Sequence, residues 1–241
     1  MTWGRPSRAF RWLNPRPRSS RWWPALGTPV ASLLTIRWHA GPTHTARLGP
    51  PTGSFTRLAA AGFDFTCAIS SACALACWGD LPTGLPKSPA GSYRAVAVAR
   101  THACAIASDG SLSCWGENAA GESTPPSGSF VAVAAAMSFS CAIRSDGTLA
   151  CWGDNTSGQG SPPAGVYVDL AVETSMEIPS KAHSCALSAD GKVTCWGDNS
   201  FGQTTPPNQT FAQLSAGDLH TCALSVGGQL WCWGLYARQP L

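Results

Sequence analysis

Charged side chains are scarce in this sequence. Lysine, arginine, aspartate and glutamate make up 12% of its 241 residues, about half of the roughly 25% found in average globular domains. Residues 1–62 carry nine arginines and no acid, whereas residues 63–241 carry three lysines and four arginines against 13 acids, a net charge of 7 − 13 = −6. Because nucleic-acid binding needs a basic surface, this balance argues against such binding by residues 63–241.

The N-terminal segment lacks an apolar run long enough to span a bilayer. Its apolar stretch, Trp22–Ile36, has 15 residues and is broken by Pro24 and Pro29, whereas a spanning helix needs about 20. A basic segment followed by a short apolar one resembles a secretory signal, although Arg37–Ala40 has no small residue three before a cleavage point. Three interpretations of residues 1–50 stay open: a weak signal or anchor, a disordered basic arm, and a degenerate repeat. We expect membrane contact only through this segment.

Recognised catalytic patterns are missing too. No serine, histidine and aspartate are spaced as a nucleophile motif requires, and neither Gly-x-Gly-x-x-Gly nor a repeated Asp-x-Asp calcium loop occurs. Acidic residues fall instead in turns, at Asp109, Asp146 and Asp190, where their ordinary role is to accept hydrogen bonds from the backbone. We therefore expect no enzyme activity, no catalytic residue and no cofactor.

The sequence does contain a repeat. A Cys-Trp pair recurs five times, and the intervals between its tryptophans are 37, 37, 44 and 37 residues: Trp78, Trp115, Trp152, Trp196 and Trp233. A fixed period of this size indicates a repeat architecture. No helical period is evident, and three strands are predicted per unit. The first strand of each unit is predicted at Phe55–Ala60, Tyr93–Val98, Phe130–Ala135, Tyr167–Val172 and Phe211–Ala216.

Each unit holds two cysteines ten positions apart, on either side of a turn. In the second unit the turn signal is Asp109-Gly110, which is typical of a hairpin. A three-residue loop over 108–110 places Cys104 opposite Cys114, with Cα atoms about 4.5 Å apart and within reach of a disulfide. A two-residue loop would place Cys104 opposite Trp115 instead, and we favour the first register. It predicts five disulfides: Cys67–Cys77, Cys104–Cys114, Cys141–Cys151, Cys185–Cys195 and Cys222–Cys232.

Five disulfides in one chain indicate an oxidising compartment: the extracellular space, the periplasm or the cell surface. The alternative is that these cysteines are reduced and packed as small apolar residues. Cys73 is left over, and it occupies the turn position that Gly110, Gly147 and Gly191 hold in other units. We expect its thiol to be exposed, and nothing near it in sequence marks it as a nucleophile.

Two aromatic positions of the repeat allow a functional and a structural interpretation. His102, His183 and His220 each stand two residues before a cysteine, and zinc binds both residue types. Because Phe65 and Phe139 take the same position in the other units, we favour aromatic packing and expect no metal. The repeated tryptophan is predicted to be core between neighbouring units, rather than part of a ligand-stacking set. Its opposing positions are small: Thr66, Ala103, Ser140, Ser184 and Thr221.

The loops that follow the Cys-Trp pair are the candidate partner-binding parts. They share a Gly-Asp/Glu-Asn pattern, and the long fourth interval adds seven residues near Glu173–Lys181. Insertions in repeats fall on surface loops, often on a binding face, although an error in the sequence itself would explain this one equally well. The candidate contacts are Glu117, Asn118, Asp154, Asn155, Glu173, Met176, Glu177, Asp198 and Asn199.

The unit from His183 to Gln203 resembles the repeat of the regulator of chromosome condensation family. The matching residues are His183, Cys185-Ala186-Leu187, Asp190-Gly191 and Cys195-Trp196-Gly197-Asp198-Asn199, followed by Gly202-Gln203. The short period and paired cysteines are more similar to the bacterial secreted branch that includes beta-lactamase inhibitor protein II. The resemblance implies an all-β fold, a β-propeller with one blade of three or four short strands per repeat. The family usually has seven blades; here residues 51–241 hold five clear repeats, so an incomplete or a six- to seven-bladed ring is expected.

The first functional hypothesis is a non-enzymatic, extracytoplasmic module that presents loops to a protein partner. The alternatives implied by the resemblance are a guanine-nucleotide exchange regulator and a secreted inhibitor of a beta-lactamase-type enzyme. The paired cysteines argue against an intracellular exchange factor. Sugar binding stays open as well.

Overall fold

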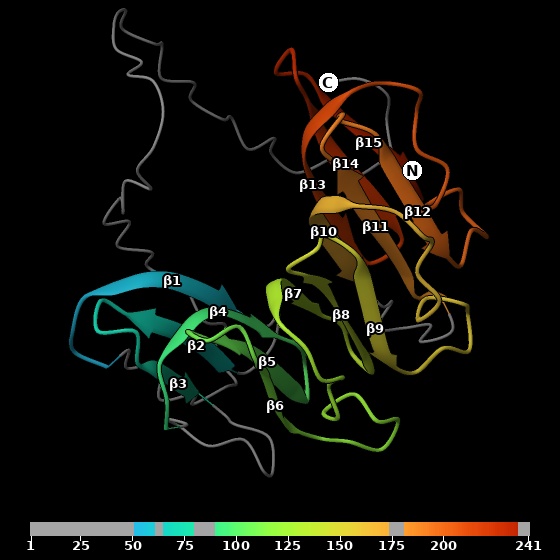
Figure 1. Ribbon diagram of the computed structural model, residues 1–241. Coiled ribbons are helices and arrows are strands. Elements are labelled where there is room, and N and C mark those ends of the chain that lie inside the picture. The colour runs from blue at the N-terminus through green and yellow to red at the C-terminus, as the bar shows by residue number, and fades with distance from the viewer. Residues whose placement is uncertain (1–50, 61–64, 80–89, 174–180, 236–241) are drawn as a thin grey trace, which may run out of the picture. The chain divides into compact units, whose positions relative to one another are not determined.

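The computed structural model describes residues 51–60, 65–79, 90–173 and 181–235. These residues form an all-β fold of five three-stranded antiparallel sheets, each made from one repeat (Figure 1). We call the sheets blades 1 to 5. No helix in these ranges is long and apolar enough to cross a membrane. The strands are β1 (Phe55–Ala60), β2 (Phe65–Ser70), β3 (Leu75–Gly79), β4 (Tyr93–Val98), β5 (His102–Ala107), β6 (Leu112–Gly116), β7 (Phe130–Ala135), β8 (Phe139–Arg144), β9 (Leu149–Gly153), β10 (Tyr167–Glu173), β11 (His183–Ser188), β12 (Val193–Gly197), β13 (Phe211–Gly217), β14 (His220–Ser225) and β15 (Leu230–Gly234).

The hairpin register is the predicted one. In blade 2, Cys104 lies opposite Cys114 and Ala103 lies opposite Trp115, and the equivalent pairs recur in the other four blades. The turn holds this register because Gly110 has a φ of 93°, a left-handed conformation that glycine adopts without steric cost. Asp109 Oδ1 accepts a hydrogen bond of 2.9 Å from the backbone N–H of Ser111. The turn acids therefore have the structural role that their position indicated.

The first strands of the blades differ from the prediction in two ways, one of which concerns only two blades. β10 and β13 are each one residue longer than expected, because Glu173 pairs with His183 and Gly217 pairs with His220. A register shift also follows the first residue of each first strand. Such bulges add one unpaired residue and increase the local twist. Alternating apolar residues carry no signal for them, which is why they were not predicted.

Five disulfides join the cysteine pairs that the register brings together. The Cα atoms of each pair are 4.0–4.1 Å apart, as expected for opposed residues that are not hydrogen-bonded to each other. The first cysteine is fully buried in blades 1 to 4, at Cys67, Cys104, Cys141 and Cys185. The disulfides are consistent with an oxidising environment.

Cys73 is the free cysteine of the described residues, and it is exposed. Its φ is 62°, the one positive φ that a residue other than glycine adopts in the described ranges. The left-handed conformation costs about 1–2 kcal/mol for a residue with a Cβ atom. Blade 1 therefore has a less favourable turn than the blades that carry glycine there.

We expect Cys73→Gly to raise the free energy of unfolding by about 1 kcal/mol, because the strain of the turn is larger than the extra chain entropy of glycine. Urea unfolding monitored by tryptophan fluorescence measures the change. Cys73→Ala is the matched control, since it removes the thiol and keeps the Cβ atom. Equal stability of the glycine and alanine variants would contradict the account.

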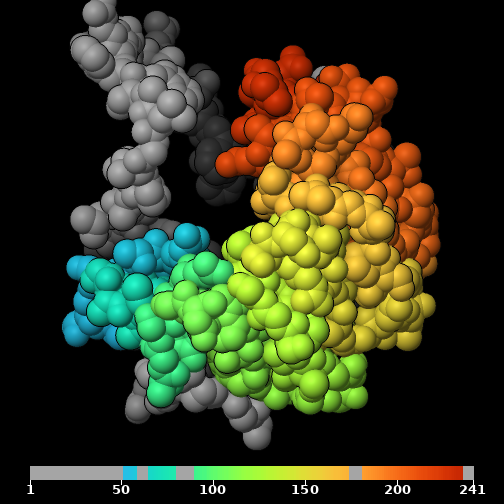
Figure 2. Space-filling view, viewed as in Figure 1, coloured from blue at the N-terminus to red at the C-terminus, as the bar shows by residue number. Residues whose placement is uncertain are grey.

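The core lies between consecutive blades. Cys104 and Ile106 of blade 2 pack with Phe130 and Trp152 of blade 3, and Cys185 and other residues of blade 4 pack in the same way with blade 5. Contacts between first strands run from each blade to the next along the chain, in the order of the colours in Figure 2. Each blade thus presents two different faces. In blades 1 to 4 the cysteine face packs against the following blade, and in blades 2 to 5 the tryptophan face packs against the preceding one.

Candidate functional site

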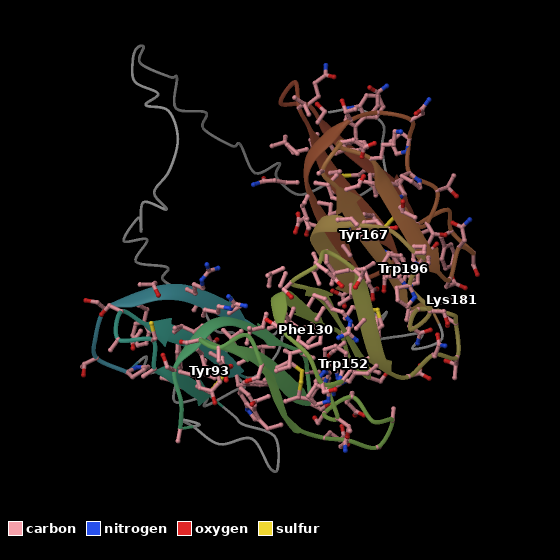
Figure 3. All side chains as sticks on the ribbon, viewed as in Figure 1. Tyr93, Phe130, Trp152, Tyr167, Lys181 and Trp196 are labelled. Carbon is pink, nitrogen blue, oxygen red and sulfur yellow. A yellow bond between two sulfur atoms is a disulfide. The ribbon has the colours of Figure 1, made fainter. Side chains whose placement is uncertain are left out.

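Three of the five repeated tryptophans hydrogen-bond to the preceding blade. The indole N–H of Trp152 donates a hydrogen bond of 2.8 Å to the backbone oxygen of Glu122, in the loop of the preceding blade. Trp196 and Trp233 donate in the same way to the backbone oxygens of Gln159 and Gln203. Trp152 is only 9% exposed and Trp233 only 5%. Figure 3 shows Trp152 and Trp196 between the strands of adjacent blades. Trp152, Trp196 and Trp233 therefore pack between blades rather than forming a ligand-stacking surface.

Two of the histidines make a second link between blades. His102 Nε2 is 2.8 Å from Ser140 Oγ of blade 3, and His183 Nε2 is 2.9 Å from Thr221 Oγ1 of blade 5. Both histidines are fully buried, and burial lowers the pKa of each to about 4. Among the described residues, no group of three or more histidine, cysteine or acidic side chains is arranged to hold a metal ion. The histidines have the packing position that Phe65 and Phe139 take in other blades.

This histidine link was not found in the sequence, although a signal for it exists. Each linked histidine has a hydroxyl residue one position before the first cysteine of the next unit, Ser140 for His102 and Thr221 for His183. Phe65, which cannot make this bond, has Ala103 at that position. Phe139 is followed by Ser184, whose hydroxyl instead donates to the backbone oxygen of Gln159 over 3.4 Å. Comparing successive units, rather than one unit alone, would have exposed the pairing.

The asparagines of the candidate loops fold the loops themselves. Asn155 Oδ1 accepts a hydrogen bond of 2.8 Å from the N–H of Gly160, and its Nδ2 donates to Ser161 over 2.9 Å. Asn118 and Asn199 make the equivalent pairs of bonds in blades 2 and 4. These three asparagines are exposed at the surface, yet their amide groups already have partners within the loop. Their structural role is to hold each loop in one conformation.

The carboxylate of Asp198 is also engaged within its blade. It accepts hydrogen bonds from Ser200 and from Gln203 Nε2, and it pairs with Lys181 Nζ over 3.2 Å. Burial acts to raise the pKa of Asp198, but these hydrogen bonds outweigh it and hold the pKa below its ordinary value. Lys181, labelled in Figure 3, also donates to Ser200 Oγ over 2.6 Å. The C-terminal end of the inserted stretch is thereby attached to the loop of blade 4.

The remaining candidate residues are distributed as follows. Glu117 is exposed, Asp154 is half-buried, and Glu173 is half-buried at the end of β10. Met176 and Glu177 lie outside the described residues. The predicted role of the insertion therefore stays a prediction, as do the three interpretations of residues 1–50. The described loops share internal hydrogen bonds from an asparagine. They also carry exposed residues, Phe201 among them at 37% exposure.

One loop carries a buried acid where the other two carry an amide. Gln159 Nε2 donates to Asp154 over 2.8 Å and Gln203 Nε2 donates to Asp198 over 2.8 Å. Glu122 takes the same place in blade 2, is 3% exposed, and accepts from the N–H of Ala120. A carboxylate has no proton to donate in this position. The loop of blade 2 therefore lacks the hydrogen bond that the other two loops make.

Glu122→Gln is expected to raise the free energy of unfolding by about 1 kcal/mol, the usual value of one added hydrogen bond. The reverse change, Gln159→Glu, is the matched control and is expected to lower it by about 1–3 kcal/mol, because a buried group loses its donor. Thermal or urea unfolding at neutral pH measures both. A stability of Glu122→Gln at or below that of the unchanged protein would show that the loop of blade 2 is stabilised differently.

The repeats match a known family. The regulator of chromosome condensation (RCC1) repeat matches residues 90–122, 130–159, 181–203 and 211–235. None of the curated proteins compared with the chain matches it. Among solved structures, the ectodomain of the receptor kinase CR4 from Physcomitrella patens is 26% identical. That comparison covers 78% of this chain and 54% of the other, with a TM-score of 0.63.

Two further structures share the fold. The CRINKLY ectodomain of the Arabidopsis thaliana receptor kinase ACR4 is 24% identical, covering 78% of this chain and 66% of the other, with a TM-score of 0.62. Prp20p from Saccharomyces cerevisiae, described with its binding to Gsp1p and histones, is 17% identical, covering 75% and 58%, with a TM-score of 0.63. The chain therefore spans between about half and two thirds of the length of these solved chains. The predicted β-propeller fold is confirmed.

Proposed function

The chain belongs to the RCC1 repeat family, and from this we propose that it is a non-enzymatic protein-binding module of an extracytoplasmic compartment. Five disulfides support the compartment, because such bonds persist where the surroundings are oxidising. Protein binding by a relative of the same fold, Prp20p, supports the class of function. The closer likeness to the secreted branch with beta-lactamase inhibitor protein II stays a prediction.

The observation that carries the proposal is the hydrogen bonding within the loops. Asn155 and Asn199 each close a loop through hydrogen bonds to its far side, so a partner would meet residues already fixed in position. Rigid loops bind with a smaller loss of conformational entropy than flexible ones. Phe201 stands at the tip of the blade 4 loop with 37% of its surface exposed. Exposed aromatic side chains are the usual anchors of protein interfaces.

The residues of each loop then have one of two roles, holding the loop in shape or contacting the partner. Asp154, Asp198 and the loop asparagines hold the frame, and the tip residues beside them make the contacts. Glu117 is an exposed acid in the blade 2 loop, and it adds negative charge to a domain that is acidic overall. We expect a partner with a basic rim and an apolar pocket for Phe201. The same division predicts that asparagine variants lose stability, whereas tip variants lose only binding.

The test is capture of partners by the full chain from the extracellular fluid of its own source, with identification of the captured proteins. Phe201→Asp is expected to reduce capture of the specific partner at least tenfold, a typical loss for an interface anchor. Val226→Asp is the matched control, because Val226 is an apolar residue that is 70% exposed in the turn between β14 and β15 and does not belong to a loop that follows a Cys-Trp pair. Capture that is unchanged in Phe201→Asp and in loop-shortened variants would count against binding through the loops.

Two other functions follow from the resemblance and are tested with the same protein. Inhibition of a beta-lactamase by the purified chain would assign it to the inhibitor group. Acceleration of nucleotide release from a small GTPase would assign it to the exchange regulators and would contradict an extracytoplasmic role. The binding module predicts neither activity.

A further inference from the structure

The interface between consecutive blades is built in the same way four times within the chain. The cysteine face of one blade contributes a His or Phe side chain, a cystine and a branched aliphatic residue. The tryptophan face of the next blade contributes an aromatic residue of the first strand, a small residue and the tryptophan. Blade 5 has a complete cysteine face, and blade 1 has a complete tryptophan face. These two faces are the ones without a neighbour in the described part of the chain.

The cysteine face of blade 5 is consistently less buried than its counterparts. His220 and Leu224 are half-buried there, whereas the equivalent residues of blades 1 to 4 are at most 3% exposed. Leu230 is 41% exposed, and its counterparts Leu112 and Val193 pack against the core of the following blade. Blade 5 thus presents an apolar face of a kind that the chain covers everywhere else.

The tryptophan face of blade 1 shows the complementary difference. Thr66 is half-buried, whereas its four counterparts, Ala103, Ser140, Ser184 and Thr221, are fully buried. Phe55 is half-buried as well, and the equivalent aromatic residues of blades 2 to 5 are at most 6% exposed. Trp78 contacts Phe55 with ring centroids 6.2 Å apart. The aromatic surface is therefore formed but incompletely covered.

The polar groups of the two faces also match. Within the chain, His102 binds the hydroxyl of Ser140 and His183 binds that of Thr221, in each case a histidine two residues before a cysteine and a hydroxyl one residue before the next. His220 has the first position in blade 5, and Thr66 has the second in blade 1. Joining the two faces would pair His220 with Thr66 in the pattern already present twice.

We propose that the cysteine face of blade 5 binds the tryptophan face of blade 1 in a second copy of this chain. The contact continues the interface that the chain builds between its own blades, with the same apolar residues and the same histidine–hydroxyl pair. Because two different faces meet, the contact is heterologous, and copies add head to tail. This surface is separate from the loops of the proposed function and does not depend on them.

The test is the mass of the full chain in solution, measured by light scattering over a range of concentrations. The unchanged protein is expected to rise from the 25.1 kDa of one chain to at least twice that mass. Leu230→Asp on blade 5 and Thr66→Arg on blade 1 are each expected to keep the protein monomeric, with the mass of one chain at every concentration. Both positions are already partly exposed, so the blades can accept the changes. Leu230→Lys gives a second blade 5 variant of opposite charge, and circular dichroism checks that each variant is folded.

Mixing the two variants separates this contact from any other. The Leu230→Asp chain keeps its blade 1 face and the Thr66→Arg chain keeps its blade 5 face, so the mixture is expected to form a complex of one copy of each. Val226→Asp is the control and is expected to associate like the unchanged protein. A monomeric mass of the unchanged protein at every concentration would overturn the proposal. So would association of the Leu230→Asp variant by itself, or a mixture of the two variants that remains monomeric.

Discussion

Reduction of the five disulfides is expected to unfold the described domain. Each disulfide closes a loop with a sequence separation of 10, which contributes about 2.7 kcal/mol in the chain-entropy description. Five such bonds together contribute about 13 kcal/mol, which is comparable to the whole stability of a typical domain, about 5–15 kcal/mol. Because the first cysteine of each pair is fully buried in blades 1 to 4, the chain has to be unfolded, reduced and then returned to native conditions. Near-ultraviolet circular dichroism of the tryptophans measures the result.

A single disulfide gives the graded control. Replacing Cys104 and Cys114 together by alanine is expected to lower the free energy of unfolding by about 3 kcal/mol and to leave the chain folded. Oxidation of the reduced chain is expected to restore the native spectrum. A reduced chain that recovers its native spectrum and its midpoint of unfolding without oxidation would show that packing between blades alone specifies the fold.

Acid is expected to destabilise the domain in a defined range of pH. Burial lowers the pKa of His102 and His183 to about 4, whereas an unfolded chain keeps the ordinary value of about 6.5. Between these values the unfolded state binds more protons than the folded state, so stability falls as pH falls from about 6.5 to about 4. The loss is on the order of 3 kcal/mol for each histidine. Urea unfolding at a series of pH values measures it.

The repeat itself supplies the matched variant. His102→Phe installs the residue that Phe65 and Phe139 already place at the same position, and it is expected to remove about half of the pH dependence between 6.5 and 4. At neutral pH it loses the hydrogen bond to Ser140, a cost of about 1 kcal/mol. An unchanged slope in this variant would mean that other groups titrate in this range and that the buried histidines do not control acid stability.

The hairpin was predictable from the sequence because several constraints on it agree. Asp109-Gly110 fixes the turn, the turn fixes the register, and the register alone explains why cysteines stand ten apart in every unit. The small residues opposite each tryptophan indicated a buried ring, and Ala103 does face Trp115. Five copies of one pattern made each inference an internal comparison. Register and disulfide pairing followed from local chemistry for this reason, whereas the propeller fold was implied by the resemblance to a known repeat.

The contacts between blades were less accessible to sequence reasoning. Trp152 donates to the backbone oxygen of Glu122. Because every residue has a backbone carbonyl, the type of the acceptor residue does not reveal this bond in the sequence. Polar residues such as Asn155 fit a binding loop and a self-closing loop equally well, and only the geometry shows that its amide is occupied within the loop. Sequence reasoning could not separate the residues that hold the frame of each candidate loop from the residues left free to contact a partner.

The most direct measurement of the central claim is the number of free thiols in the protein purified from its own source without reductant. The account of a disulfide-stapled propeller predicts one reactive thiol per chain under denaturing conditions, from Cys73, and eleven after reduction, the full number of cysteines. Alkylation followed by mass spectrometry counts them. Eleven thiols before reduction would contradict both the disulfides and the extracytoplasmic compartment, and would favour the alternative of an intracellular exchange regulator.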